Sequence, residues 1–239
     1  MITPETIKSL ANKYQTTEGN IRQEYIQHLF LAYFYQQPQT SEVYFKGGTA
    51  LRVVYGSPRF SEDLDFSTTL QHVDPLEEAL LTTLKEIELE GIHAEIQEAK
   101  KTTGGYLAIV VFTIGTDKVI IRLEVSLREG DKRGVVETIV SDFIPPYTIT
   151  ALAKNQLVGE KMQALLTRKK PRDFYDLYYM IRANMITPEE KSILPQAMKV
   201  VQATTVNFDR ELKQFLPKSQ RSVIREFRVN LEREIKRFL

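Results

Sequence analysis

The feature that most constrains the fold is a change of pattern near residues 145–150. Before it, short segments of alternating apolar and polar residues are mixed with segments of helical spacing. After Pro145-Pro146, which interrupt regular structure, nearly the whole chain has helical spacing. The pattern predicts an α+β domain over residues 1–148 and an all-helical domain over residues 149–239, with no long Gly/Ser linker between them.

Within the first domain, glycines and prolines separate the expected elements. We expect strands at 43–45, 64–66, 94–98, 106–114 and 119–127, and helices over 21–34, 50–55 and 75–90. The three later strands are expected to extend the sheet begun at Val43 in an antiparallel manner.

The composition excludes several kinds of protein. With 42% hydrophobic residues the 239-residue chain has enough apolar side chains for a core, so it is not disordered. The absence of cysteine excludes disulfides, zinc fingers and thiol nucleophiles, and three scattered histidines argue against a histidine-rich metal site. Neither a signal-peptide profile nor an apolar run of about 18–20 residues is visible. We therefore expect a cytoplasmic protein that does not bind a membrane.

The charge is divided unevenly along the chain. Residues 151–239 hold 18 Lys and Arg against 10 Asp and Glu, a net charge of +8, which leaves −7 on residues 1–150. This division favours a cation site in the first part and an anionic partner, such as phosphate or nucleic acid, for the second. The alternative is that helical surfaces are simply rich in Lys and Arg.

A glycine turn and a pair of acids lie close together in the sequence. Gly47, Gly48 and Thr49 follow the first strand and open a helix, which favours contact with an anion. Asp63 and Asp65 supply the one or two carboxylates that Mg²⁺ usually takes from a protein, and a strand end is a suitable place for them. Together these features suggest a nucleoside triphosphate with its metal, although Asp-x-Asp alone is commonplace.

A third acid is available on a later strand. Glu124 alternates with apolar residues, and it would stand beside Asp63 and Asp65 if the strands were neighbours. Three carboxylates around two metal ions would activate a hydroxyl and neutralise a leaving pyrophosphate. The alternative is that Glu124 only faces water.

The helical part carries a second cluster of charged residues. Lys161 lies among apolar residues, so its amine either reaches solvent from the core or binds phosphates. Asp173 and Asp176 share a helix face, and at least one of them is expected to cap the helix or to pair with Lys169 or Arg172. The aromatic residues after Asp173 are interpreted mainly as core, with stacking on a terminal base as the alternative.

Three stretches in this order resemble the AbiEii/AbiGii toxin family of nucleotidyltransferases, a branch of the DNA polymerase β-like superfamily. They are Phe45–Arg52 with Arg59–Phe66, which contain the glycine turn and Asp-x-Asp; Gly159–Leu166 with Arg168; and Arg172–Leu177. Together they span residues 45–177.

The resemblance implies a polymerase β-like mixed sheet with flanking helices, followed by a helical bundle, with the active site between them. It assigns Asp63, Asp65, Lys161 and Asp176 or Asp173 to catalysis. Asp63 and Asp65, with Glu124 as a less clear third ligand, would hold Mg²⁺. Nucleotide binding would involve a larger set: Gly47, Gly48, Thr49, Arg59, Ser61 and Lys161.

The resemblance also suggests partners. Family members act as toxins beside an antitoxin, and some add nucleotides to the 3′ end of tRNA, so we expect an NTP substrate, a tRNA acceptor and an antitoxin or promoter-linked partner. The predicted RNA-binding residues are Arg168, Lys169, Lys170 and Arg172. The alternatives are transfer to a small molecule, as in antibiotic nucleotidyltransferases, transfer to a protein hydroxyl, or a non-catalytic nucleotide-binding module.

Overall fold

The computed structural model describes residues 1–127 and 130–239, which form two compact units. The first, here called the α+β unit, comprises Met1–Gly56 and Phe60–Leu152. The second, the helical unit, comprises Ala153–Leu239 together with the short segment Ser57–Arg59. Among the helices of the described residues, none has both the length and the apolar character needed to cross a lipid bilayer.

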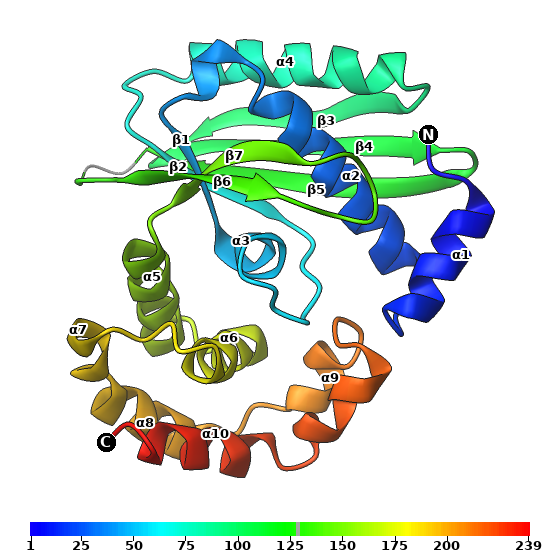
Figure 1. The fold of residues 1–239 in the computed structure, drawn as a ribbon. Helices are drawn as coiled ribbons and strands as arrows, with labels where there is room; N and C mark the ends of the chain where they lie inside the picture. The colour runs from blue at the N-terminus through cyan, green and yellow to red at the C-terminus, as the bar shows by residue number, and fades with distance from the viewer. Residues whose placement is uncertain (128–129) are drawn as a thin grey trace. The chain divides into compact units, whose positions relative to one another are not determined.

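The α+β unit is built on a mixed sheet (Figure 1), which confirms the predicted fold class. In the described residues the sheet has seven strands in the order β3-β4-β5-β2-β1-β7-β6. The strands are β1 (Val43–Lys46), β2 (Leu64–Thr68), β3 (His93–Thr102), β4 (Gly105–Ile114), β5 (Asp117–Ser126), β6 (Gly134–Ile139) and β7 (Tyr147–Leu152).

The sheet differs from the sequence prediction in two respects. Strands β3, β4 and β5 form the expected antiparallel series, but β5 joins β2 in parallel, so the prediction of a wholly antiparallel extension is wrong. Strands β6 and β7 were not predicted; β7 follows the two prolines and pairs in parallel with β1. The sheet therefore continues to Leu152, beyond the expected boundary.

Helices in the α+β unit provide the second half of its core. They are α1 (Pro4–Lys13), α2 (Glu18–Phe34), the 3-10 turn η1 (Pro38–Thr40), α3 (Gly47–Val53) and α4 (Asp74–Leu89). Apolar residues of α2 and α4 pack with the buried residues of the strands in one core. Strand β5 shows the underlying pattern, because Val119, Ile121, Leu123 and Val125 are buried while the residues between them are exposed.

Among the described residues of the helical unit, every regular element is a helix. They are α5 (Lys154–Thr167), α6 (Pro171–Arg182), α7 (Pro188–Lys191), α8 (Leu194–Ala203), α9 (Phe208–Leu212), η2 (Lys218–Ile224) and α10 (Phe227–Lys236). Helix α6 contacts α5, α9 and α10 and carries the buried side chains Phe174 and Tyr175. The ring of Tyr175 stacks on that of Phe227, with centroids 6.0 Å apart, so these two aromatics belong to the core.

Candidate active site

Strand β1 leads directly into a glycine that touches an acid on the neighbouring strand. Lys46 is the register partner of Asp65 in the antiparallel β1–β2 pair, and Gly47 follows it with a φ of 84°. A Cβ added at Gly47 would lie 2.0 Å from Oδ2 of Asp65. Both the backbone conformation and the close approach of this carboxylate therefore require glycine at position 47.

The two acids of the Asp-x-Asp motif lie at the start of strand β2. Asp63 immediately precedes β2 and Asp65 is its second residue, while Leu64 between them is fully buried. Residues two apart in an extended segment point to the same side, so extended backbone from Asp63 to Asp65 would place both carboxylates opposite the buried Leu64. Both residues are half-buried. This arrangement gives a pair of carboxylates beside the glycine turn.

Glu124 lies on the strand next to Asp65 but has a partner of its own. In the parallel β2–β5 pair, Asp65 and Glu124 are register partners, so their side chains leave the same face of the sheet. The half-exposed Glu124 carboxylate accepts a hydrogen bond from Nε of Arg122 at 2.6 Å. Within residues 1–127 and 130–239, no three His, Asp or Glu side chains gather closely enough to hold a metal ion. The structure thus places Glu124 beside Asp65 without assembling the predicted group of three.

Thr49 supports the segment Ser61–Asp63, here called the acidic segment, from inside the protein. Gly48 and Thr49 are buried in the first turn of α3, and Oγ1 of Thr49 donates to the backbone carbonyl of Asp63 at 2.5 Å. This hydroxyl therefore holds the backbone of the acidic segment. Sequence reasoning had expected Thr49 to contact a phosphate.

A buried ion pair lies against Phe60, the residue just before the acidic segment. Arg52 on α3 donates two hydrogen bonds, of 2.6 and 2.9 Å, to the carboxylate of Glu24 on α2. Its guanidinium also lies 3.5 Å from the centre of the Phe60 ring, a close cation–π contact. Burial raises the pKa of Glu24 and the charge of Arg52 opposes this effect. Sequence reasoning missed this pair; the available signal was a glutamate inside an otherwise apolar helical pattern.

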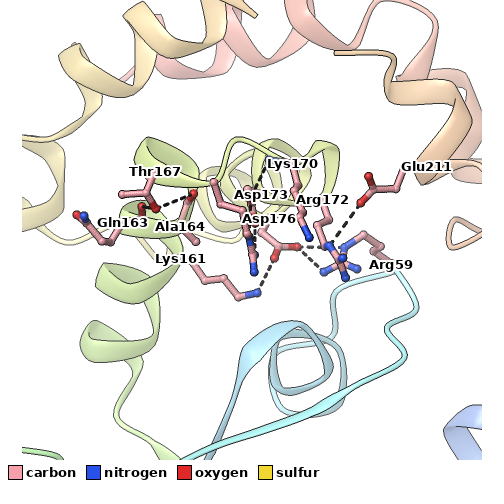
Figure 2. Close-up of polar contacts among 11 residues, drawn as sticks. Arg59, Lys161, Gln163, Ala164, Thr167, Lys170, Arg172, Asp173, Asp176 and Glu211 are labelled. Carbon is pink, nitrogen blue, oxygen red and sulfur yellow. Dashed lines mark hydrogen bonds and ion pairs between the residues drawn. The ribbon is translucent and has the colours of Figure 1, made fainter. Parts of the chain in front are cut away.

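In the helical unit, Lys161 and Arg59 converge on Asp176 (Figure 2). Nζ of Lys161 donates to Oδ2 of Asp176 at 2.7 Å, and Nε and Nη2 of Arg59 donate to Oδ1 at 3.1 and 2.8 Å. The exposed fractions of the Lys161, Arg59 and Asp176 side chains are 11%, 3% and 1%. Helices α5 and α6 and the segment Ser57–Arg59 thus contribute one residue each to a buried charged cluster.

The charge of Asp176 is set by opposing effects. Burial disfavours its carboxylate form, but the nearby charges of Arg59 and Lys161 and their hydrogen bonds outweigh burial and lower its pKa. Asp176 is therefore ionised at neutral pH. Within this cluster, two cationic side chains share the carboxylate of Asp176.

Asp173 has a different environment from Asp176. Its carboxylate accepts a hydrogen bond from the backbone N–H of Lys170 at 2.8 Å, which caps the start of α6, and it pairs with the guanidinium of Arg168. It is Asp176, not Asp173, that meets Lys161. This capping arrangement is the structural alternative that the sequence pattern had left open.

The predicted RNA-binding residues divide into two kinds. Arg168 is paired with Asp173, and Nε of Arg172 lies 3.4 Å from the carboxylate of Glu211. Lys169 and Lys170 are exposed in the turn between α5 and α6, where Lys169 has a φ of 54°. Ser61, predicted to bind nucleotide, is half-buried and belongs to the acidic segment described above.

Comparisons with known proteins find two structures with a similar fold. Two crystal structures from Helicobacter pylori are similar to the chain: a protein to which nucleotidyltransferase activity has been attributed (TM-score 0.68, 19% identity, 93% of this chain and 95% of that chain) and JHP933 (TM-score 0.68, 20% identity, 93% of each chain). No curated protein sequence matches the chain.

The match to a family model is more specific than these likenesses of fold. Residues 29–239 match the model described as nucleotidyl transferase AbiEii toxin of a type IV toxin–antitoxin system. The matched range contains the glycine turn, both acids of Asp-x-Asp, Lys161 and Asp176. The chain therefore belongs to the AbiEii family of nucleotidyltransferase toxins.

Proposed function

We propose that the protein transfers a nucleoside monophosphate from an NTP to the 3′ end of an RNA, with tRNA as the expected acceptor, in a Mg²⁺-dependent reaction. The observation that carries this proposal is the Asp-x-Asp motif at the start of β2, where Oδ2 of Asp65 lies against Gly47. Such a pair of carboxylates next to a glycine turn suits a metal–triphosphate complex.

The donor set fits Mg²⁺. This ion usually takes one or two carboxylates and completes its shell with water and substrate phosphates, so Asp63 and Asp65 suffice without Glu124. When bound, the ion would neutralise charge on the phosphates and favour ionisation of the attacking hydroxyl. We propose Asp63 and Asp65 as its ligands and leave Glu124 as a neighbour held by Arg122.

We further propose that Lys161 binds the triphosphate and that Asp176 orients it. A lysine ammonium has three donors, of which the bond to Asp176 uses one. Arg59 holds the other oxygen of Asp176 and lies only four residues before Asp63 in the sequence.

The chemical step is a displacement at the α-phosphorus. An oxygen of the acceptor hydroxyl forms the new bond to phosphorus, its proton passes to solvent, and the bond to the leaving pyrophosphate breaks with its electron pair. Positive charge from Lys161 stabilises the charge that develops on the phosphates. Asp173 has no part in this proposal, since its carboxylate caps α6.

Charge and family membership support the choice of acceptor and partner. The net charge of +8 on residues 151–239, with Lys169 and Lys170 exposed, favours RNA over a small molecule or a protein hydroxyl. The family model names a toxin–antitoxin system, so we propose that an antitoxin counteracts this activity. Because NTPs and tRNA are cytoplasmic, we place the reaction there.

The first prediction tests the transfer reaction directly. Purified protein incubated with total tRNA, Mg²⁺ and each radiolabelled NTP should label the RNA. Asp65→Asn, which removes a proposed metal ligand, and Lys161→Met, which removes the phosphate-binding amine, should each lower labelling by at least about 100-fold.

Asp173→Asn is the matched control. Its amide oxygen still accepts the capping hydrogen bond, so labelling should stay within about threefold of the native protein. Labelling of a protein or an aminoglycoside in place of RNA would contradict the RNA acceptor, and unaltered labelling by Lys161→Met would contradict the assigned site. Binding of NTP by the native protein without labelling of any acceptor would instead indicate a non-catalytic nucleotide-binding module.

A further inference from the structure

Side chains of helix α2 hold the acidic segment Ser61–Asp63. Three successive backbone carbonyls lie just before β2 begins at Leu64, and each accepts a hydrogen bond from a side chain. Buried backbone carbonyls need such partners where no strand supplies them. In addition to Thr49, the donors come from α2.

Gln27 is the central donor. Its Nε2 lies 2.9 Å from the carbonyl oxygen of Ser61 and 3.0 Å from that of Glu62. Only 1% of this residue is exposed, so its amide is costly to bury without such partners. A glutamine at this position in the core is therefore explained by the segment that it holds.

Gln23 ties the same segment to a neighbouring strand. Its Nε2 donates to the carbonyl of Glu62 at 2.8 Å and to that of Ile120 on β5 at 2.9 Å. Gln23 and Gln27 are four residues apart, so they share one face of α2. Because β5 pairs with β2, this contact links the acidic segment to the strand beside Asp65.

We propose that Gln27, assisted by Gln23, is a positioning residue that sets Asp63 and Asp65 for divalent-cation binding. The proposal rests on the proposed role of these acids as metal ligands. Metal ligands must be placed within about 0.5 Å, and a loop ordered before binding does not have to be ordered by the ion. Loss of the clamp should therefore weaken cation binding itself.

The test measures Mn²⁺ binding to the full chain without nucleotide, by electron paramagnetic resonance. Gln27→Met keeps the size of the side chain but removes its donors, and should weaken Mn²⁺ binding by about tenfold. Gln23→Met leaves the hydrogen bonds from Gln27 in place and should weaken Mn²⁺ binding by about threefold. This second variant still tests the proposal if Gln27→Met does not fold.

Gln37→Met is the matched control, because Nε2 of Gln37 also donates to a backbone carbonyl, that of Tyr33 at 3.1 Å, away from the acids. It should lower the melting temperature without changing Mn²⁺ affinity. Native affinity in folded Gln27→Met and Gln23→Met would overturn the positioning role while leaving the proposed function intact. If Asp63→Asn and Asp65→Asn bind Mn²⁺ as the native protein does, the metal site and the clamp both fail.

Discussion

At the scale of single residues, the contact between Gly47 and Asp65 restricts which residue can stand at position 47. The positive φ excludes most side chains, and the carboxylate occupies the place where a Cβ would stand. A side chain at position 47 would therefore cost both backbone strain and a clash with the Asp65 carboxylate. Gly115 allows the strain to be measured alone, because it has a φ of 61° and a Cβ added there meets nothing within 4 Å.

We predict that Gly47→Ala lowers activity far more than it lowers stability. The left-handed backbone costs about 1–2 kcal/mol for either alanine, so Gly47→Ala and Gly115→Ala should lose similar free energies of unfolding from this cause. Only Gly47→Ala displaces Asp65, and a shift of about 1 Å at a catalytic group costs on the order of 100-fold in rate. Urea unfolding and the tRNA-labelling assay measure the two effects. Equal activities in the two variants would contradict the assigned role of this contact.

At the scale of elements, α2 is more than a core helix. It carries Gln23 and Gln27 to the acidic segment. It also carries Glu24 to Arg52 and His28 to Tyr147 of β7. Nδ1 of His28 lies 2.8 Å from the hydroxyl of Tyr147, and the imidazole stacks on Phe143. Burial, with a smaller effect from the charge of Arg52, lowers the pKa of His28 to about 3.

This pKa predicts a loss of stability in mild acid. The folded state keeps His28 neutral, while the unfolded chain protonates it below about pH 6.5. Between pH 6.5 and pH 3 the unfolded state therefore gains a proton that the folded state does not bind, and the free energy of unfolding falls by up to about 1.4 kcal/mol per pH unit. His28→Gln, which cannot titrate, should show a smaller loss between pH 7 and pH 5 in urea unfolding.

His93→Gln serves as the control, because it also replaces a histidine but one whose side chain is 69% exposed. Should His28→Gln and the native protein lose stability in parallel, buried His28 would not be the cause.

At the scale of the whole molecule, the uneven charge is the property that bears on the acceptor. Arg168 and Arg172 form ion pairs with Asp173 and Glu211, respectively. Lys169 and Lys170 are exposed. The two lysines should therefore contribute to phosphate binding without a role in the fold.

We predict that affinity for tRNA falls steeply with salt and that the double variant Lys169→Gln, Lys170→Gln reduces this dependence. Each lost phosphate contact should lower the slope of log affinity against log salt by about 0.7–0.9. Fluorescence anisotropy with labelled tRNA between 50 and 200 mM salt, about the range in which such contacts are resolved, measures the slope. The control removes two exposed lysines of the α+β unit, Lys8→Gln and Lys85→Gln. The same slope in the double variant and the native protein would exclude these lysines from the RNA interface.

The sequence alone determined the α+β class, the glycine turn with its acids, and the motif residues Lys161, Asp173 and Asp176, because these depend on local periodicity and on short spacings. Only the tertiary structure showed the parallel β2–β5 pairing that puts Glu124 next to Asp65, the added strands β6 and β7, and the choice between Asp173 as a cap and Asp176 as the partner of Lys161. Alternation along a strand tells which face a residue occupies but not which strand lies beside it. Likewise the purpose of Gln27 becomes visible only when α2 meets a segment more than thirty residues away in the chain, because contacts between distant segments are set by packing of the whole core.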